Sequence, residues 1–105
     1  MTEARIVLTT ASSPEEARGI ARALVERRLA ACVNIVPGIE SVYRWQGKVE
    51  TAAECLLVIK TQVGLFDRLR DAIGELHSYD LPECVMLEIS AGSEKYLSWI
   101  KENSG

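Results

Sequence analysis

The sequence predicts an α+β fold in which two helices cover one face of an antiparallel sheet. The first observation is the order of apolar periodicities, which reads strand, helix, strand, strand, helix, strand and an added helix. The second is a long β-hairpin within residues 30–61. The third is the length of 105 residues, which accommodates one hydrophobic core and hence a single domain over residues 1–105. This order of elements is typical of the ferredoxin-like split βαβ arrangement.

The first strand is expected over residues 5–10, where apolar and β-branched residues run almost without interruption. Such a run is typical of a central strand buried on both faces. A helix start follows, because Ser13 is a natural N-cap, Pro14 suits the first helical position and Glu16 completes a capping box. The apolar residues that follow have helical spacing and predict an amphipathic helix ending near Arg28.

The hairpin is predicted from alternating side chains on both sides of a turn at Trp45-Gln46-Gly47-Lys48, where glycine permits a positive φ. The pair Pro37-Gly38 predicts a bulge or bend in the first arm. Both arms exceed the roughly 5–6 residues of an ordinary strand. Apolar residues on both faces and a free edge favour pairing with another chain. The hairpin therefore predicts an obligate oligomer.

The second half of the chain repeats the pattern of helix and strand. A helical stripe is expected over residues 65–76, followed by a loop over residues 77–83, because Pro82 keeps Leu81 out of helical geometry. A strand is predicted over residues 85–89, and Gly92-Ser93-Glu94 opens a short C-terminal helix. Two helices on one face leave the other face of the sheet without cover, which is a second indication of an oligomer.

Composition excludes several classes of partner. The net charge is −3 and the pI is about 5.2, which disfavours a nucleic-acid-binding protein. No apolar run approaches the ~20 residues of a membrane span. The N-terminus lacks a basic segment followed by an apolar one, so a cytoplasmic location is expected. There the three cysteines are expected to be reduced thiols.

Four separated motifs resemble the CutA family of divalent-cation-tolerance proteins, in the same order and over nearly the whole chain. They are Ala30-Ala31-Cys32-Val33-Asn34-Ile35 with Pro37-Gly38, Ser41-Val42-Tyr43-Arg44-Trp45-Gln46-Gly47-Lys48, the segment His77 to Glu83, and Tyr96-Leu97-Ser98-Trp99. The resemblance implies a homotrimer of ferredoxin-like subunits, joined by strand pairing between hairpins. It also implies copper or another divalent metal as ligand. One position departs from the family, which usually has Pro after the histidine where this chain has Ser78.

The soft metal ligands of the sequence are Cys32, Cys55, Cys84 and His77, besides two methionines. No C-x-x-C or H-x-x-x-H spacing indicates a closed zinc site. Cys55 is expected to be a small buried hydrophobe, and Cys84 an ordinary residue at the loop-to-strand junction.

The predicted metal ligands are Cys32, His77 and Glu83, with further ligands from a neighbouring subunit. Thiolate and imidazole favour copper, or alternatively zinc. Cys32 lies within a motif that the family shares, although it could equally be a small buried hydrophobic residue in a strand. His77 is the one histidine, and its alternative role is to contact exposed carbonyls at a helix end.

A second hypothesis is a small-molecule sensor like the PII-type trimers, in which Lys60, Tyr79 and Glu83 recognise an anionic or polar metabolite in a cleft between subunits. Tyr43 and Trp45 are either an aromatic wall for such a ligand or anchors of the oligomer interface, and the interface is favoured for Trp45. Three carboxylates are candidates for a functional site, although a solvated surface position is the default expectation for a glutamate. They are Glu50, Glu54 and Glu83.

An enzyme using His77 as general acid or base is the weakest hypothesis. The sequence supplies no combination of nucleophile, base and orienting group from which a reaction could be assembled. The expectation is therefore a binding protein and not an enzyme.

Overall fold

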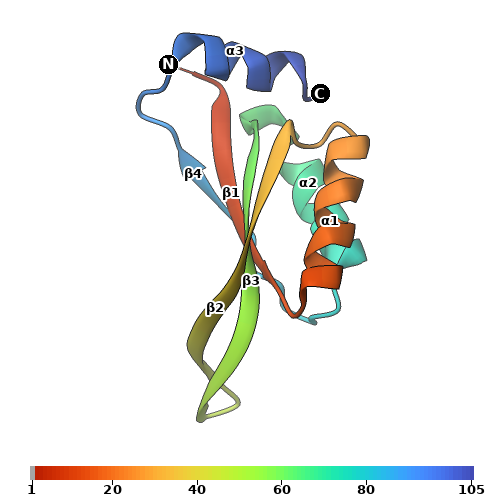
Figure 1. The fold of residues 1–105 in the computed structure, drawn as a ribbon, viewed down its shortest axis with the longest axis vertical. Helices are drawn as coiled ribbons and strands as arrows, with labels where there is room; N and C mark the ends of the chain where they lie inside the picture. Colours follow the sequence, from red (N-terminus) through yellow and green to blue (C-terminus); the bar gives the residue numbers. More distant parts are fainter. Residues whose placement is uncertain (1) are drawn as a thin grey trace.

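The computed structural model describes residues 2–105, and its four strands form one antiparallel sheet in the order β2-β3-β1-β4 (Figure 1). The elements are β1 (Ala4–Ala11), α1 (Pro14–Glu26), β2 (Cys32–Trp45), β3 (Lys48–Gln62), a 3₁₀ turn (Val63–Leu65), α2 (Phe66–Leu76), β4 (Val85–Glu88) and α3 (Glu94–Glu102). This is the predicted order of strands and helices. The boundaries differ by a few residues, β4 being one residue shorter than expected.

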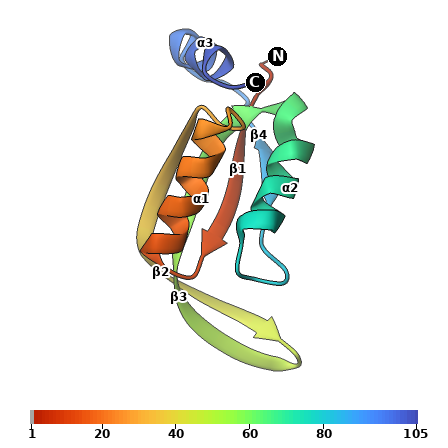
Figure 2. The same ribbon diagram turned by 90° about the vertical axis from the view of Figure 1, so that its right-hand side faces the viewer.

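Helices α1 and α2 lie side by side on one face of the sheet, and α3 lies across one end (Figure 2). The main core is formed between the sheet and these two helices. Its largest fully buried members are Val7, Ile20, Leu24, Leu57, Ile59, Leu69 and Ile73. A smaller cluster forms where α3 meets the start of β1, around Ile100. None of the helices within residues 2–105 is long and apolar enough to cross a membrane.

The start of α1 follows the predicted signals with one difference. The Ser13 hydroxyl accepts a hydrogen bond from the Glu16 backbone N–H (3.1 Å), as an N-cap should. The Glu16 carboxylate, however, reaches past the N-cap and accepts from the backbone N–H and the hydroxyl of Ser12, both at 2.9 Å. The capping box is thus shifted by one residue, which leaves the second Glu16 oxygen free for another donor.

The end of α1 was expected near Arg28, but the helix ends at Glu26 and Arg28 adopts a left-handed φ of 59°. Leu29 N–H donates to the Leu24 carbonyl (2.9 Å) and Arg28 N–H to the Val25 carbonyl (3.0 Å), which is the pattern of a Schellman motif. Glycine normally occupies this position. Arginine is held there because its guanidinium donates to the carbonyls of Glu102 (2.9 Å) and Gly105 (2.7 Å).

The hairpin has the predicted turn, bulge and length. Gln46 and Gly47 both have positive φ, of 50° and 80°, as a two-residue type I′ turn requires. The register of β2 against β3 shifts between Val36 and Ile39, and Gly38 has a φ of 71°. The strands are 14 and 15 residues long, well above the usual length.

The distal half of the hairpin, residues 39–54, extends beyond the sheet because β1 ends opposite Cys55 (Figure 1). We call these residues the distal hairpin. Beyond that point β2 and β3 pair only with each other. Cys55, Leu57 and Ile59 alternate along β3 and are buried against the helices. Glu54 is also buried, although it precedes Cys55 directly and so points to the opposite side of the strand. The side of β3 that faces the rest of the molecule therefore changes at Glu54, where the ribbon turns away from the sheet.

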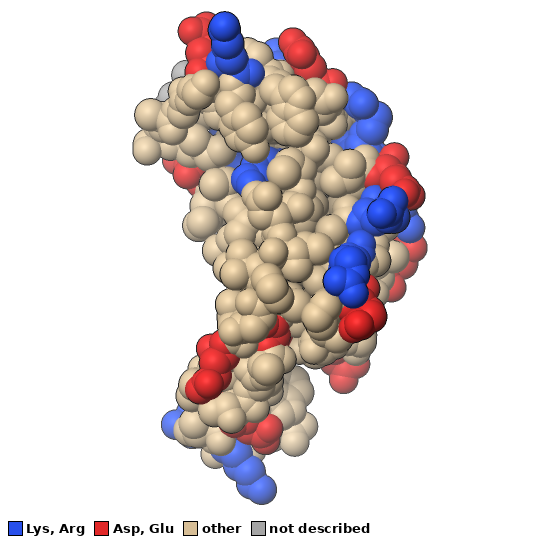
Figure 3. Space-filling model, in the orientation of Figure 1, with Lys and Arg blue, Asp and Glu red and all other residues tan. Residues whose placement is uncertain are grey.

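The face of the sheet opposite α1 and α2 has little cover. The expectation that β1 is buried on both faces is wrong for the single chain, since Ile6 and Leu8 on this face are only partly buried. Val36 of β2 and Leu87 of β4 are exposed beside them. Figure 3 shows charged side chains gathered over α1, α3 and the distal hairpin, with few over the surface between. We call this face, with Cys32, Val36, Lys60 and Leu87, the uncovered face.

We expect Arg28→Ala to lower the free energy of unfolding by about 1–2 kcal/mol, since two hydrogen bonds from a charged donor are lost. Arg28→Gly loses the same bonds but adopts the left-handed conformation without strain, so it should be about 1 kcal/mol more stable than the alanine variant. Denaturant unfolding at one protein concentration measures both. Equal stability of wild type and the alanine variant would contradict a role for the guanidinium.

Candidate functional site

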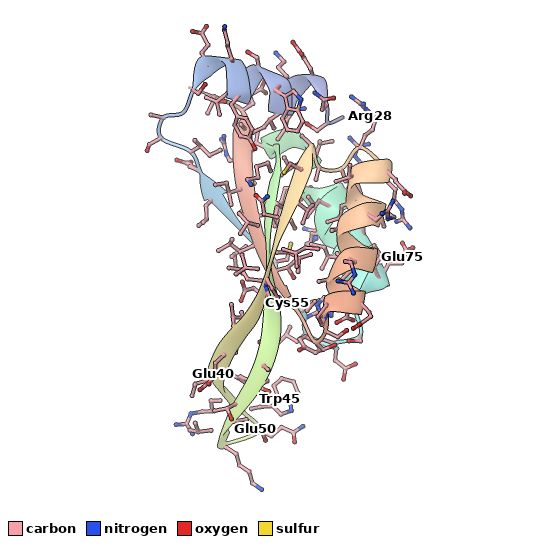
Figure 4. The ribbon with its side chains drawn as sticks, in the orientation of Figure 1. Arg28, Glu40, Trp45, Glu50, Cys55 and Glu75 are labelled. Atoms are coloured by element: carbon pink, nitrogen blue, oxygen red, sulfur yellow. The ribbon has the colours of Figure 1, made fainter. Side chains whose placement is uncertain are left out.

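A cleft of about 740 Å³ lies between the distal hairpin and the loop that joins α2 to β4. Its walls come from β2, from Glu54 of β3, from Thr10 near the end of β1 and from the loop. The lining residues are Thr10, Ser41, Val42, Tyr43, Trp45, Glu54, Ser78, Tyr79, Asp80, Leu81 and Glu83. Figure 4 shows Trp45 close to the tip of the hairpin, so the cleft reaches almost the full length of the distal ribbon. Its volume is in the range of small-molecule sites.

The local sequence explains why these side chains converge. After the bulge at Pro37-Gly38, the residues Ser41, Tyr43 and Trp45 alternate along β2 and share one side of the ribbon. Cross-strand pairing of Ile39 with Glu54 places the carboxylate on that same side. The bulge therefore determines which side chains of the hairpin face the loop.

Glu54 lies at the base of the cleft, with only 8% of its surface exposed. Its Oε2 accepts a hydrogen bond of 2.7 Å from the Tyr79 hydroxyl. The pKa of Glu54 lies below its ordinary value: burial alone would raise it, but hydrogen bonds from hydroxyl groups, those of Ser41, Tyr79 and Thr10, outweigh burial. Burial, and then the bond to this carboxylate, raise the pKa of the Tyr79 hydroxyl.

His77 is fully buried behind the cleft, where it caps the end of α2. Its Nε2 lies 2.6 Å from the Thr10 carbonyl oxygen, and its Nδ1 accepts a 3.1 Å hydrogen bond from the Tyr79 backbone N–H. This pairing fits the neutral tautomer with the proton on Nε2. Both ring nitrogens are therefore engaged within the chain, and they hold the loop against the end of β1.

Glu16 ties the same loop to the start of α1. Its Oε2 accepts a 2.9 Å hydrogen bond from the Ser78 backbone N–H, a donor that a proline at this position would lack. Burial alone would raise the pKa of Glu16, but hydrogen bonds from Ser78 and Ser12 lower it to about 2. Ser78 thus adds a hydrogen-bonded contact between the loop and the helix.

The structure does not assemble the predicted metal ligands within one chain. Cys32 pairs with Lys60 on the uncovered face, whereas His77 contacts Thr10, which pairs with Leu56. The two pairing positions, Leu56 and Lys60, are about 13 Å apart along β3. Glu83 lines the cleft. No cluster of three or more His, Cys, Asp or Glu side chains within residues 2–105 is arranged to hold a metal ion.

The remaining cysteines have the positions that the sequence suggested. Cys55 is buried in the core, as expected of a small hydrophobe, and Cys84 is half-buried just before β4. Burial raises the pKa of the Cys84 thiol, which makes it a poorer thiolate ligand. Cys32 is half-buried, beside the Tyr96 hydroxyl of α3.

The residues proposed for small-molecule recognition divide between two faces. Tyr43, Trp45, Tyr79 and Glu83 line one cleft, so the aromatic-wall hypothesis gains support for both hairpin residues. Lys60 is elsewhere, because its ammonium group donates to the Asn34 side chain on the uncovered face. Within one chain the cleft therefore has no lysine with which to bind an anion.

Sequence reasoning missed three contributors to this region, namely Thr10, Glu16 and Ser41. It named Glu54, but its default expectation was that this carboxylate is exposed to solvent. The signal for Glu54 was present, since it is a carboxylate immediately before the continuous apolar run of residues 55–59. Thr10 and Glu16 act through contacts with residues more than 60 positions away, which local patterns do not reveal.

The lowered pKa of Glu16 predicts how stability depends on pH. The stabilisation by its carboxylate is complete above about pH 4.5, the ordinary value, and is lost as pH falls toward about 2. Its size is at most about 3 kcal/mol from a shift of this magnitude. Glu16→Gln should lower the free energy of unfolding at neutral pH and flatten its dependence over this range.

Ser78→Pro provides a second variant, because it removes both the backbone N–H and the hydroxyl that Ser78 donates to Glu16, while the extended backbone of His77 suits a residue before proline. It should move the acid loss of stability toward pH 4.5. Denaturant unfolding at several pH values and one protein concentration measures both variants. Parallel curves for wild type and Glu16→Gln would contradict the assignment.

The chain is similar to known proteins over almost its whole length. Residues 5–103 match the family described as CutA1 divalent ion tolerance protein. The chain is 53% identical over 100 residues to the divalent-cation tolerance protein CutA of Thermus thermophilus, covering 95% of this chain and 97% of that protein. It is 46% identical over 99 residues to the chloroplastic protein CutA of Arabidopsis thaliana, covering 94% of this chain but 54% of that longer protein.

Solved structures agree with the sequence comparison. The structure of the divalent cation tolerance protein Cut A1 from Thermus thermophilus superposes with a TM-score of 0.95 at 52% identity, covering 97% of this chain and 99% of that one. This confirms the predicted ferredoxin-like α+β fold. With the family match extending from residue 5 to residue 103, the chain belongs to the CutA1 divalent ion tolerance family.

Proposed function

We propose that this protein is a cytoplasmic homotrimer that binds a divalent transition metal, copper or alternatively zinc, and has no catalytic activity. The observation that carries the proposal is the uncovered face of the sheet, which bears exposed apolar side chains and the half-buried thiol of Cys32. The family's association with divalent ions supports the class of ligand. Three free cysteines suit a reducing compartment.

The trimer is supported by surface that a monomer would leave in water. Val36 and Val42 on β2 and Val85 and Leu87 on β4 are exposed. β2 and β4 are also the two edges of the sheet, so each carries unpaired backbone groups. Contact between copies would bury the apolar side chains and satisfy the edges together.

Metal binding depends on that assembly. Residues 2–105 supply no metal-holding cluster in one chain, and the ring nitrogens of His77 are already hydrogen-bonded. Cys32 fits a shared site better, because it lies on the face that we assign to contact between copies. A thiolate there would provide a soft ligand suited to copper or zinc. The predicted participation of His77 and Glu83 requires a neighbouring subunit and a change in the His77 contacts.

The second candidate function is small-molecule sensing, and the cleft beside the hairpin favours it. The cleft combines aromatic walls with a buried carboxylate whose pKa is shifted, a combination typical of binding sites. The ligand of the PII-type hypothesis was expected to be anionic or polar. Since the carboxylates of Glu54, Asp80 and Glu83 line the cleft, an anion is disfavoured and a polar ligand remains.

We expect light scattering to give three subunits at low micromolar concentration. Val36→Asp should dissociate the trimer, because burial of an unpaired charge costs several kcal/mol. Val25→Asp is the matched control, since Val25 of α1 is exposed to the same degree (41% against 42%) but lies outside the sheet. A folded monomer in the wild type would contradict the trimer, and an unaffected Val36→Asp would place the interface elsewhere.

Zinc titration calorimetry tests the metal site without oxidising thiols. Cys32→Ser should weaken zinc binding strongly and Cys55→Ser should not, since the Cys55 thiol is buried in the core. His77→Ala separates the two readings of the imidazole: weaker binding supports ligation, whereas lower stability with unchanged binding supports the observed structural role. An isotherm unchanged in both Cys32→Ser and His77→Ala would remove the proposed site and favour the small-molecule function.

A further inference from the structure

We propose that the cleft between the distal hairpin and residues 78–83 binds an organic ammonium ion, with its charged nitrogen at the Glu54 carboxylate and its carbon groups against Tyr43 and Trp45. This inference rests on the second proposed function, small-molecule binding in this cleft. Its main residues differ from Cys32, the thiol of the proposed metal site on the uncovered face, although Glu83 belongs to both proposals.

The charge of the cleft has one sign. Its lining includes the carboxylates of Glu54, Asp80 and Glu83, and no lysine, arginine or histidine of residues 2–105 lines it. A cleft of one charge with low-dielectric walls concentrates ions of the opposite charge. The cleft therefore attracts cations and repels carboxylates and phosphates.

Glu54 gives the cation a specific position. The side chain is more than nine-tenths buried, yet its oxygens are hydrogen-bonded to hydroxyl groups and form no ion pair within the part of the chain that the structure describes. The hydroxyl donors keep the carboxylate ionised at neutral pH, so its negative charge is available to a cation in the cleft. Tyr79 directs its hydroxyl at one oxygen, so the carboxylate is held in place before a ligand arrives.

The aromatic residues give the ligand an organic part. Tyr43 and Trp45 are 42% and 44% exposed, so their rings are available to a ligand. The faces of tyrosine and tryptophan rings attract ammonium groups. Leu81 of the loop is exposed opposite the hairpin and adds apolar surface to the same cleft. These contacts suit the alkyl groups around a positively charged nitrogen.

A bare metal ion fits this cleft less well than an organic cation. Glu54, Asp80 and Glu83 line one cavity but do not form a metal-holding cluster of three. The cavity is also far larger than a single ion, at about 740 Å³. Separated carboxylates along an aromatic wall match a ligand that extends over several atoms.

Fluorescence of Trp45 provides a reporter inside the cleft. The chain has two tryptophans, and Trp99 lies on α3 outside it, so Trp99→Phe leaves Trp45 as the single tryptophan. We would titrate this variant, with EDTA present, with choline, with its neutral isostere 3,3-dimethylbutan-1-ol and with the anion 3,3-dimethylbutanoate. Choline should bind at least about tenfold more tightly than the alcohol, and the anion should not bind.

A matched pair of variants locates the charge. In the same background, Glu54→Gln should reduce choline affinity by about tenfold or more and leave the affinity for the alcohol unchanged. Glu75→Gln removes one carboxylate on α2 that pairs with Arg27 away from the cleft, and should have no effect. If Glu54→Gln proves unfolded by circular dichroism, Asp80→Asn at the cleft is tested instead, with a smaller loss of about two- to threefold.

The outcomes separate the inference from the function on which it rests. Alcohol and choline binding with equal affinity at Trp45 would keep small-molecule binding and overturn the preference for a cation. No change of Trp45 fluorescence with any of the three probes would overturn both. Loss of choline binding when zinc is added without EDTA would show competition by a metal ion and overturn the organic cation as the occupant.

Discussion

The pairing of β3 along its whole length is the constraint on which the other features depend. Over its C-terminal half β3 lies between β1 and β2, and over its N-terminal half it has β2 alone. The change occurs at Glu54 and Cys55, where one residue faces the cleft and the next faces the core. Core, uncovered face and cleft are therefore three surfaces of one strand. A shift in its register by one residue would exchange them.

The loop after α2 is positioned by polar contacts instead of apolar packing. The His77 imidazole is hydrogen-bonded to the Thr10 carbonyl at the end of β1. The Ser78 backbone N–H donates to the Glu16 carboxylate, and the Tyr79 hydroxyl donates to that of Glu54. Three separate elements thus fix the eight residues between α2 and β4, which have no regular secondary structure. This arrangement keeps the cleft wall in place while its apolar residue Leu81 remains in solvent. A preorganised wall reduces the conformational entropy that a ligand must overcome.

Features that depend on neighbours in the sequence could be predicted from it. The type I′ turn at Gln46-Gly47, the bulge after Val36 and the N-cap Ser13 each follow from residue chemistry over a few positions. Features that depend on distant segments could not. The left-handed Arg28 requires carbonyls near residue 105, and the burial of Glu54 requires a hydroxyl from the loop. The predicted group of Cys32 and His77 failed to form in one chain because strand alternation places Cys32 on the far face.

The length of the hairpin also has consequences for how the chain folds. β2 and β3 are joined by a two-residue turn, so their pairing requires only contacts that are near in sequence and can form early. β1 and β4 join the sheet through contacts between distant segments, which form later. During that interval the sides of Leu57 and Ile59 that α1 later covers are open to water, as is the edge that β1 later occupies. An unpaired strand edge beside exposed apolar side chains favours aggregation, so docking of β1 covers the surface through which newly made chains would associate.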